Sequence, residues 1–175
     1  PEIGSMYIDI GAKNKKEAER YVKVGDFFVC KPNLRKLLGQ RYVGRPLDDR
    51  VGCAILIQAL RELNKTENDI YMVFSVQEEV GCRGARTAAY GIDPDFGIAV
   101  DVTGVDDVPG ADKWGTAKLG KGAAIKVMDL SVICHPEVVK ILSDLSEEKK
   151  IAAQKDILRA GGTDAGAIHV SRMGV

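Results

Sequence analysis

The chain has 175 residues, with 25 basic and 25 acidic side chains and 45% hydrophobic residues. This composition is typical of a folded globular protein, not a disordered one, and the length allows one sizeable domain with part of another. Balanced charge gives no general field for binding nucleic acid or anionic membranes. No apolar run approaches the ~20 residues of a bilayer-spanning helix, so we expect a cytoplasmic protein without nucleic-acid or membrane partners.

The opening of the chain is β-rich and contains one short helix. The residue patterns predict a helix over 15–22 and strands over 7–10, 27–30 and 34–43, the last with a turn at Gly39. The pattern of apolar and polar residues changes after a Gly-Arg-Pro sequence. We therefore predict one domain, or part of one, over residues 1–45 and a second over residues 46–175.

Helical and strand patterns alternate along the second part of the chain. The predicted strands cover 70–76, 96–102, 123–128 and 151–158. The predicted helices cover 48–63, 84–90, 136–149 and 165–170. The helix over 48–63 is apolar on most faces, so we expect it to be buried. The predicted fold class is α/β, a layered sheet covered by helices, with a long loop over 103–122.

Each of the four cysteines lies in or beside an apolar segment, and none forms a C-x-x-C pair. They are Cys30, Cys53, Cys82 and Cys134. This placement is typical of buried free thiols in a cytoplasmic protein, and it argues against a cysteine zinc site.

Acidic residues lie after predicted strands and at a predicted helix start, where α/β enzymes have their active sites. Glu78 and Glu79 follow an apolar run, and adjacent carboxylates there repel each other and lose hydration unless a cation lies beside them. A second pair, Asp48 and Asp49, begins a predicted helix, and Asp101 ends a predicted strand. Together these acids predict a metal site with a spare carboxylate for proton transfer.

Each acid also has a simpler interpretation. Asp48 could be only a helix cap, and Asp101 only a turn former. Glu78 and Glu79 could lie in a solvated loop. Because consecutive strand residues point to opposite faces, both glutamates can serve one site only if the backbone leaves strand geometry at Gln77 or Glu78.

The motifs that carry these acids resemble metallopeptidase family forty-two. These are the tetrahedral (TET) aminopeptidases, also described as glutamyl, leucyl or deblocking aminopeptidases and sometimes as endoglucanases. The matching segments, in the order found in the family, are YIDIGA at 7–12, LDDRVG at 47–52, VQEEVG at 76–81, AVDVT at 99–103 and GGTDAG at 161–166. The resemblance covers essentially the whole chain.

The resemblance implies a three-layer zinc-exopeptidase-like fold with two divalent metal ions, zinc or cobalt. It implies that Asp48 bridges the ions, and that Glu79 and Asp101 each bind one of them. Glu78 would be the general base that takes a proton from the metal-bridging water, which suits a carboxylate that binds no metal. The resemblance also implies a cis peptide bond between Asp48 and Asp49.

The histidines depart from the family pattern. The family's site also uses one histidine before a β-rich inserted domain and another near the C-terminus. The only histidines here are His135, placed like a helix cap, and His169, among apolar residues of the last predicted helix. We therefore expect a chain incomplete at both ends, with residues 1–45 the end of the inserted domain, that binds metal weakly or binds a single ion.

Residues near the acids are candidates for contacts with substrate. Arg50, Gly162, Thr163 and Asp164 could line a substrate pocket, although Asp164 could equally cap its helix. Lys118 lies in the long loop that borders the site in the resembling family. It could meet an acidic substrate side chain or could be a solvated surface lysine.

The leading hypothesis is a metal-dependent aminopeptidase that releases N-terminal residues from short peptides. The resemblance implies homo-oligomers, with dimers assembled into a tetrahedral dodecamer. One alternative is an endoglucanase that uses paired carboxylic acids, although Trp114 as the only tryptophan gives little support for sugar stacking. The other is a catalytically inert fragment that lacks two histidine ligands.

Overall fold

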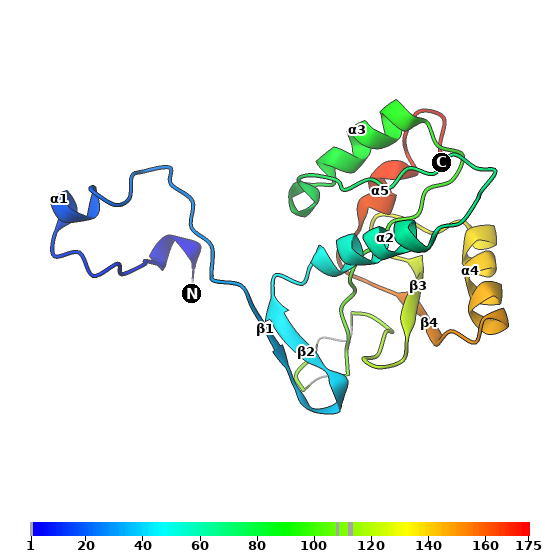
Figure 1. The fold of residues 1–175 in the computed structure, drawn as a ribbon, viewed down its shortest axis with the longest axis horizontal. Coiled ribbons are helices and arrows are strands. Elements are labelled where there is room, and N and C mark those ends of the chain that lie inside the picture. The colour runs from blue at the N-terminus through cyan, green and yellow to red at the C-terminus, as the bar shows by residue number, and fades with distance from the viewer. Residues whose placement is uncertain (1, 108, 112–113) are drawn as a thin grey trace. The chain divides into compact units, whose positions relative to one another are not determined.

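The structure, a computed structural model, describes residues 2–107, 109–111 and 114–175. The chain divides into two compact units, Pro1–Arg45 and Pro46–Val175 (Figure 1). This division falls where the change in sequence pattern placed it. The identity of the first unit as the end of an inserted domain stays a prediction.

The first unit contains a short helix and an antiparallel hairpin. Helix α1, Lys15–Ala18, begins at Asn14, whose side chain accepts a hydrogen bond from the Glu17 amide at 3.0 Å. Strand β1, Asn33–Lys36, pairs with β2, Tyr42–Arg45. The predicted turn at Gly39 is confirmed, because Gly39 has a φ of 65° in the short 3-10 helix η2, Leu38–Gln40. A further 3-10 helix, η1, spans Ile3–Ser5.

Two predicted strands of this unit are wrong. Residues 7–10 and 27–30 are in neither of the two sheets formed by the described residues, and Phe27 is 101% exposed. Their apolar patterns suit strands, but a strand exists only where a second strand takes up its hydrogen bonds. The predicted helix over 15–22 is also too long, because α1 ends at Ala18.

The second unit has a mixed α/β architecture. Its elements are α2 (Arg50–Glu62), η3 (Glu78–Val80), α3 (Arg83–Ile92), β3 (Ala123–Met128), α4 (Pro136–Glu148), β4 (Ala153–Ile157) and α5 (Asp164–Ile168). Strands β3 and β4 are parallel, with Lys126 opposite Asp156 and a shift of register between Lys126 and Met128. Helix α4 packs against β3, and α3 packs against α5 (Figure 1). None of the described helices combines the length and the apolar character needed to cross a membrane.

Small residues let the helices that carry the site approach closely. Ala85 and Ala89 of α3 and Ala167 of α5 are buried. Gly84 lies against the backbone of Val76, because its amide donates to the Val76 carbonyl at 2.9 Å and a Cβ there would lie 2.5 Å from the Val76 nitrogen. The start of α3 therefore fixes the entry of the turn that carries the two glutamates.

Two expectations for the second unit are wrong, and so is one for the cysteines of both units. Residues 70–76 and 96–102 are not strands, because they pair with no described strand. Helix α2 is not buried, since Gly52 is its only buried residue and its apolar side chains, such as Ile55 at 51%, are exposed. The four cysteines are free but not buried: Cys30 is exposed and the others are half-buried. The predicted long loop contains no helix or strand in its described residues.

Candidate metal and catalytic site

Three aspartates of the second unit converge. Each of Asp48, Asp49 and Asp101 offers a carboxylate oxygen, and these oxygens all lie within 4.8 Å of one another. The peptide bond between Asp48 and Asp49 is cis, as the family resemblance implied. The structure therefore brings together two of the three predicted metal ligands, Asp48 and Asp101, and adds Asp49.

Asp49 is held in place by the helix that it begins. It is the N-cap of α2, and its Oδ1 accepts a hydrogen bond from the Gly52 amide at 3.0 Å. A Cβ at position 52 would collide with the Asp49 carboxylate, so the close approach requires glycine. The interpretation of Asp48 as a simple helix cap is therefore wrong, and the exposed Asp48 carboxylate is free for another partner.

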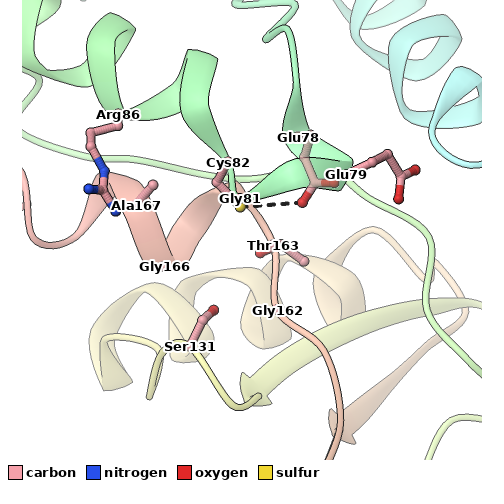
Figure 2. A pocket seen from close by; sticks show the side chains of 10 residues that line it. All are labelled: Glu78, Glu79, Gly81, Cys82, Arg86, Ser131, Gly162, Thr163, Gly166 and Ala167. Atoms are coloured by element: carbon pink, nitrogen blue, oxygen red, sulfur yellow. Dashed lines mark hydrogen bonds between the residues drawn. The ribbon is translucent and has the colours of Figure 1, made fainter.

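The backbone turns immediately before the two glutamates, although residues 70–76 do not form the predicted strand. Gln77 has a left-handed conformation, with φ 57° and ψ 39°, and it opens the single turn η3. Figure 2 shows the Glu78 side chain turned toward Cys82 and that of Glu79 turned away from it. Within the described part of the chain, Glu79 belongs to neither group of potential metal ligands, so its predicted role as a ligand stays a prediction.

Glu78 belongs to a second group with Cys82 and Asp164, whose ligand atoms also lie within 4.8 Å of one another. The Cys82 thiol donates to Glu78 Oε1 at 3.4 Å, and the Ser75 hydroxyl donates to Asp164 Oδ2 at 2.5 Å. Asp164 Oδ1 is buried and has no hydrogen-bond partner among the described residues. The N-cap of α5 is Thr163, so the interpretation of Asp164 as a cap is wrong.

A cavity of about 440 Å³ opens beside Glu78 (Figure 2). Its lining residues are Glu78, Glu79, Gly81, Cys82, Arg86, Ser131, Gly162, Thr163, Gly166 and Ala167. Two of the predicted substrate residues, Gly162 and Thr163, are thus placed in its wall. Arg50 is exposed and, like Asp164, is not among the lining residues, so their roles toward substrate stay predictions.

Mutual repulsion and burial perturb the acids. Burial, together with the charges of Asp49 and Asp48, raises the pKa of Asp101 from 3.8 to about 6. Burial and neighbouring carboxylates also raise the pKa of Glu78. Burial and the hydrogen bond to Glu78 raise the pKa of Cys82 to about 12, so this thiol remains protonated and can act as a donor.

No basic side chain neutralises these acids within the described ranges. The ion pairs found there involve none of the acids at positions 48, 49, 78, 79, 101 and 164. His135 caps α4 by accepting from the Glu137 amide at 3.3 Å, which confirms its predicted position. His169 ends α5 and is exposed, and neither histidine lies in the two groups of potential ligands.

The sequence patterns missed two residues of the site. Asp49 was noted only as the neighbour of Asp48, although its position three residues before Gly52 is the signal of an N-cap. Cys82 was interpreted as an inert thiol. Its place four residues after Glu78, beyond a glycine, is compatible with a contact across one turn, but no pattern singles it out.

Comparison with known proteins identifies the family. Over residues 1–175 the chain matches the family model described as M42 glutamyl aminopeptidase. The chain belongs to this family. A protein of Acetivibrio thermocellus, whose assignment as an aminopeptidase is itself a prediction, is 48% identical over 174 residues, which cover 99% of this chain and 52% of that protein. The lysyl aminopeptidase of Pyrococcus furiosus is 37% identical over 173 residues, covering 98% of this chain and 49% of that enzyme.

Solved structures of an aminopeptidase and of a TET peptidase have a similar fold. Aminopeptidase APDkam598 from the archaeon Desulfurococcus kamchatkensis superposes with a TM-score of 0.93 at 41% identity, covering 100% of this chain and 50% of that chain. The TET1 peptidase of Pyrococcus horikoshii can assemble into a tetrahedron or a large octahedral shell. It gives a TM-score of 0.77 at 36% identity, and the match covers 91% of this chain and 47% of that chain. The chain thus spans about half the length of the relatives that it matches.

Membership of the M42 metallopeptidases implies divalent metal ions, and the residues present fit them. Three carboxylates share one ligand sphere, and oxygen donors suit a divalent cation. The buried Asp164 Oδ1 also lacks a donor among the described residues. Burial and the neighbouring charges of Asp49 and Asp48 raise the pKa of Asp101, and a cation would favour its charged form.

The Asp49 cap can be tested with a pair of helical glycines. Gly52→Ala should destabilise the chain by about 1 kcal/mol or more, because the new methyl group displaces the Asp49 carboxylate from its cap. Gly91→Ala, in α3, meets no atom within 4 Å and should stabilise by about 0.5–1 kcal/mol. Urea denaturation of both variants measures the two changes. If both variants changed the free energy of unfolding equally, the contact at position 52 would be unimportant for stability.

The repulsion at Asp101 predicts a pH-dependent gain in stability. The folded-state pKa of Asp101 is raised from 3.8 to about 6, so its charge opposes folding above pH 6 and not below pH 4. In chelator at pH 7.5, Asp101→Asn should stabilise the chain by on the order of 1 kcal/mol, after allowance for solvent screening. The melting temperature should rise by about 2–4 °C at pH 7.5 and be unchanged at pH 4. A lower melting temperature of Asp101→Asn at pH 7.5 would contradict the repulsion at Asp101.

Proposed function

We propose that the protein containing this chain is a metal-dependent aminopeptidase that removes N-terminal residues from short peptides. The observation that carries the proposal is the convergence of Asp48 and Asp101 on one ligand sphere, with Glu78 at the wall of the neighbouring cavity. Family membership and the aminopeptidase names of the relatives support it. They favour a peptidase over a glycosidase that uses paired carboxylic acids.

Three carboxylates are the proposed metal ligands. Asp48 would bridge two ions, Asp101 would bind one of them, and Glu79 the other. Glu79 is exposed at the cavity wall, so rotation of its side chain is compatible with this role. When bound, zinc or cobalt would polarise the scissile carbonyl group and lower the pKa of a water molecule.

Glu78 is the proposed general base. It lines the cavity, and the hydrogen bond from Cys82 orients one carboxylate oxygen. Glu78 would take a proton from the attacking water and deliver it to the leaving amine. Gly162 and Thr163 line the same cavity and would border the peptide backbone. Arg50 and Asp164 remain further candidates for positioning substrate.

The relatives suggest how the protein assembles. The TET1 peptidase of Pyrococcus horikoshii forms closed shells. We infer a homo-oligomer built on the same principle, with dimers as the unit of a tetrahedral dodecamer. Residues 1–45 would be the end of the inserted domain that takes part in this assembly. Sedimentation of the whole protein would distinguish a dodecamer from a dimer or a monomer.

Replacement of the proposed base tests the mechanism directly. In the protein that contains this chain, Glu78→Gln should lower kcat for an aminoacyl-p-nitroanilide by about 10²–10⁴-fold with metal content unchanged, because the amide cannot accept the proton. Glu67→Gln is the matched control: the same chemical change at an exposed residue outside the cavity. Glu78→Gln activity equal to that of the control would exclude Glu78 as the base.

Metal binding by the chain itself gives an independent test. The two groups of potential ligands in the described residues contain carboxylates and one thiol but no imidazole. We expect residues 1–175 to bind zinc weakly or to bind a single ion, since a closed shell of ligands is the source of high affinity. Isothermal titration calorimetry measures the number and affinity of sites. Two tight zinc sites would contradict this expectation.

A further inference from the structure

A buried charged cluster of the second unit includes Thr103, which lies two residues after Asp101. Asp156 of β4 is 0% exposed and forms an ion pair with Lys126 of β3, the residue opposite it in the sheet. Burial alone would raise the pKa of Asp156, but hydrogen bonds from Lys126 and Thr103 lower it below its ordinary value. The carboxylate is therefore charged, and its neighbours compensate that charge.

Thr103 is part of this cluster and lies two residues after Asp101. Its hydroxyl donates to Asp156 Oδ2 at 2.9 Å and accepts from Lys126 Nζ at 3.0 Å. The three side chains thus form a closed triangle in which every member contacts the other two. Hydrogen bonds to charged groups are about twice as strong as neutral ones, so Thr103 is firmly anchored.

The same carboxylate also anchors a second point within the long loop. Asp156 Oδ1 accepts from the amides of Thr116 and Ala117 at 3.2 and 3.1 Å. The Thr116 hydroxyl in turn accepts a hydrogen bond from the Ile157 amide of β4 at 2.9 Å. This bond satisfies an amide that a neighbouring strand would otherwise pair. One buried carboxylate therefore ties two points of the 103–122 loop, Thr103 and residues 116–117, to the β3–β4 sheet.

This arrangement restrains Asp101. Its Oδ1 accepts from the amide of Val102 at 2.7 Å, and the next residue is the anchored Thr103. We propose that Thr103 is a positioning residue for Asp101: the Lys126–Asp156 pair holds Thr103, and Thr103 fixes where the Asp101 carboxylate meets Asp48. The inference rests on the proposed metal site. It assigns a functional role to residues that contact neither metal nor substrate.

The test removes the Thr103 hydroxyl and keeps the side-chain shape. In Thr103→Val, the backbone order parameters of residues 101–103, measured by NMR in chelator, should fall from the rigid range near ~0.85 toward ~0.6. Cobalt affinity, measured by absorbance titration, should fall about 3–10-fold, the loss of one such hydrogen bond. Thr103→Ser, which retains the hydroxyl, should restore both. Lys126→Met is less useful because it leaves Asp156 buried without a counter-charge.

Thr66→Val is the matched control, since it makes the same change at an exposed hydroxyl whose only described contact is the Asn68 amide. Thr103→Val with unchanged order parameters, or with looser backbone but wild-type cobalt affinity, would overturn the inference. Failure of Thr103→Ser to restore affinity would also overturn it. Cobalt affinity is measured on the protein that contains this chain; if that protein binds no cobalt, the proposed metal site fails, and the order parameters alone decide whether Thr103 holds the Asp101 segment.

Discussion

Repulsion between carboxylates is the constraint on which the candidate site depends. Acids at several separate positions are brought together without a described basic partner, and each is held by local structure. Asp49 is held by the first turn of α2, Glu78 by the turn after Gln77, and Asp164 by the Ser75 hydroxyl. These anchors are needed because like charges would otherwise move apart into solvent. The arrangement costs stability in the absence of a cation and becomes favourable when a divalent ion is bound.

Features set by neighbouring residues were predictable from the sequence. His135 followed by Pro136 predicted the start of α4, because a side-chain acceptor and a proline suit the first turn of a helix. A turn at Gln77 or Glu78 was expected on the condition that both glutamates serve one site, and the backbone does turn at Gln77, although Glu79 lies in neither group of potential ligands. Asp48 and Asp101 were expected together as acids at a helix start and a strand end, and they do lie together, although residues 96–102 form no strand among the described residues.

Features that depend on distant partners were not predictable. The apolar runs at 70–76 and 96–102 have the composition of strands, but they lack a described partner to complete a ladder. The contact of Ser75 with Asp164 joins residues far apart in sequence, and no local pattern encodes it. The direction of Glu79 was also missed: successive residues of a tight turn project differently, so its carboxylate diverges from that of Glu78.

Residues 70–76, which form no strand among the described residues, have a consequence for how this chain behaves in solution. They expose Tyr71, Phe74 and Val76, and their amides and carbonyls lie outside any ladder of the described residues. Such a segment is an open template for β-addition, because another extended peptide can satisfy its backbone groups and cover its apolar side chains at once. Handled by itself at high concentration, the polypeptide is therefore prone to self-association into amyloid-like or amorphous material unless a complementary strand occupies that edge.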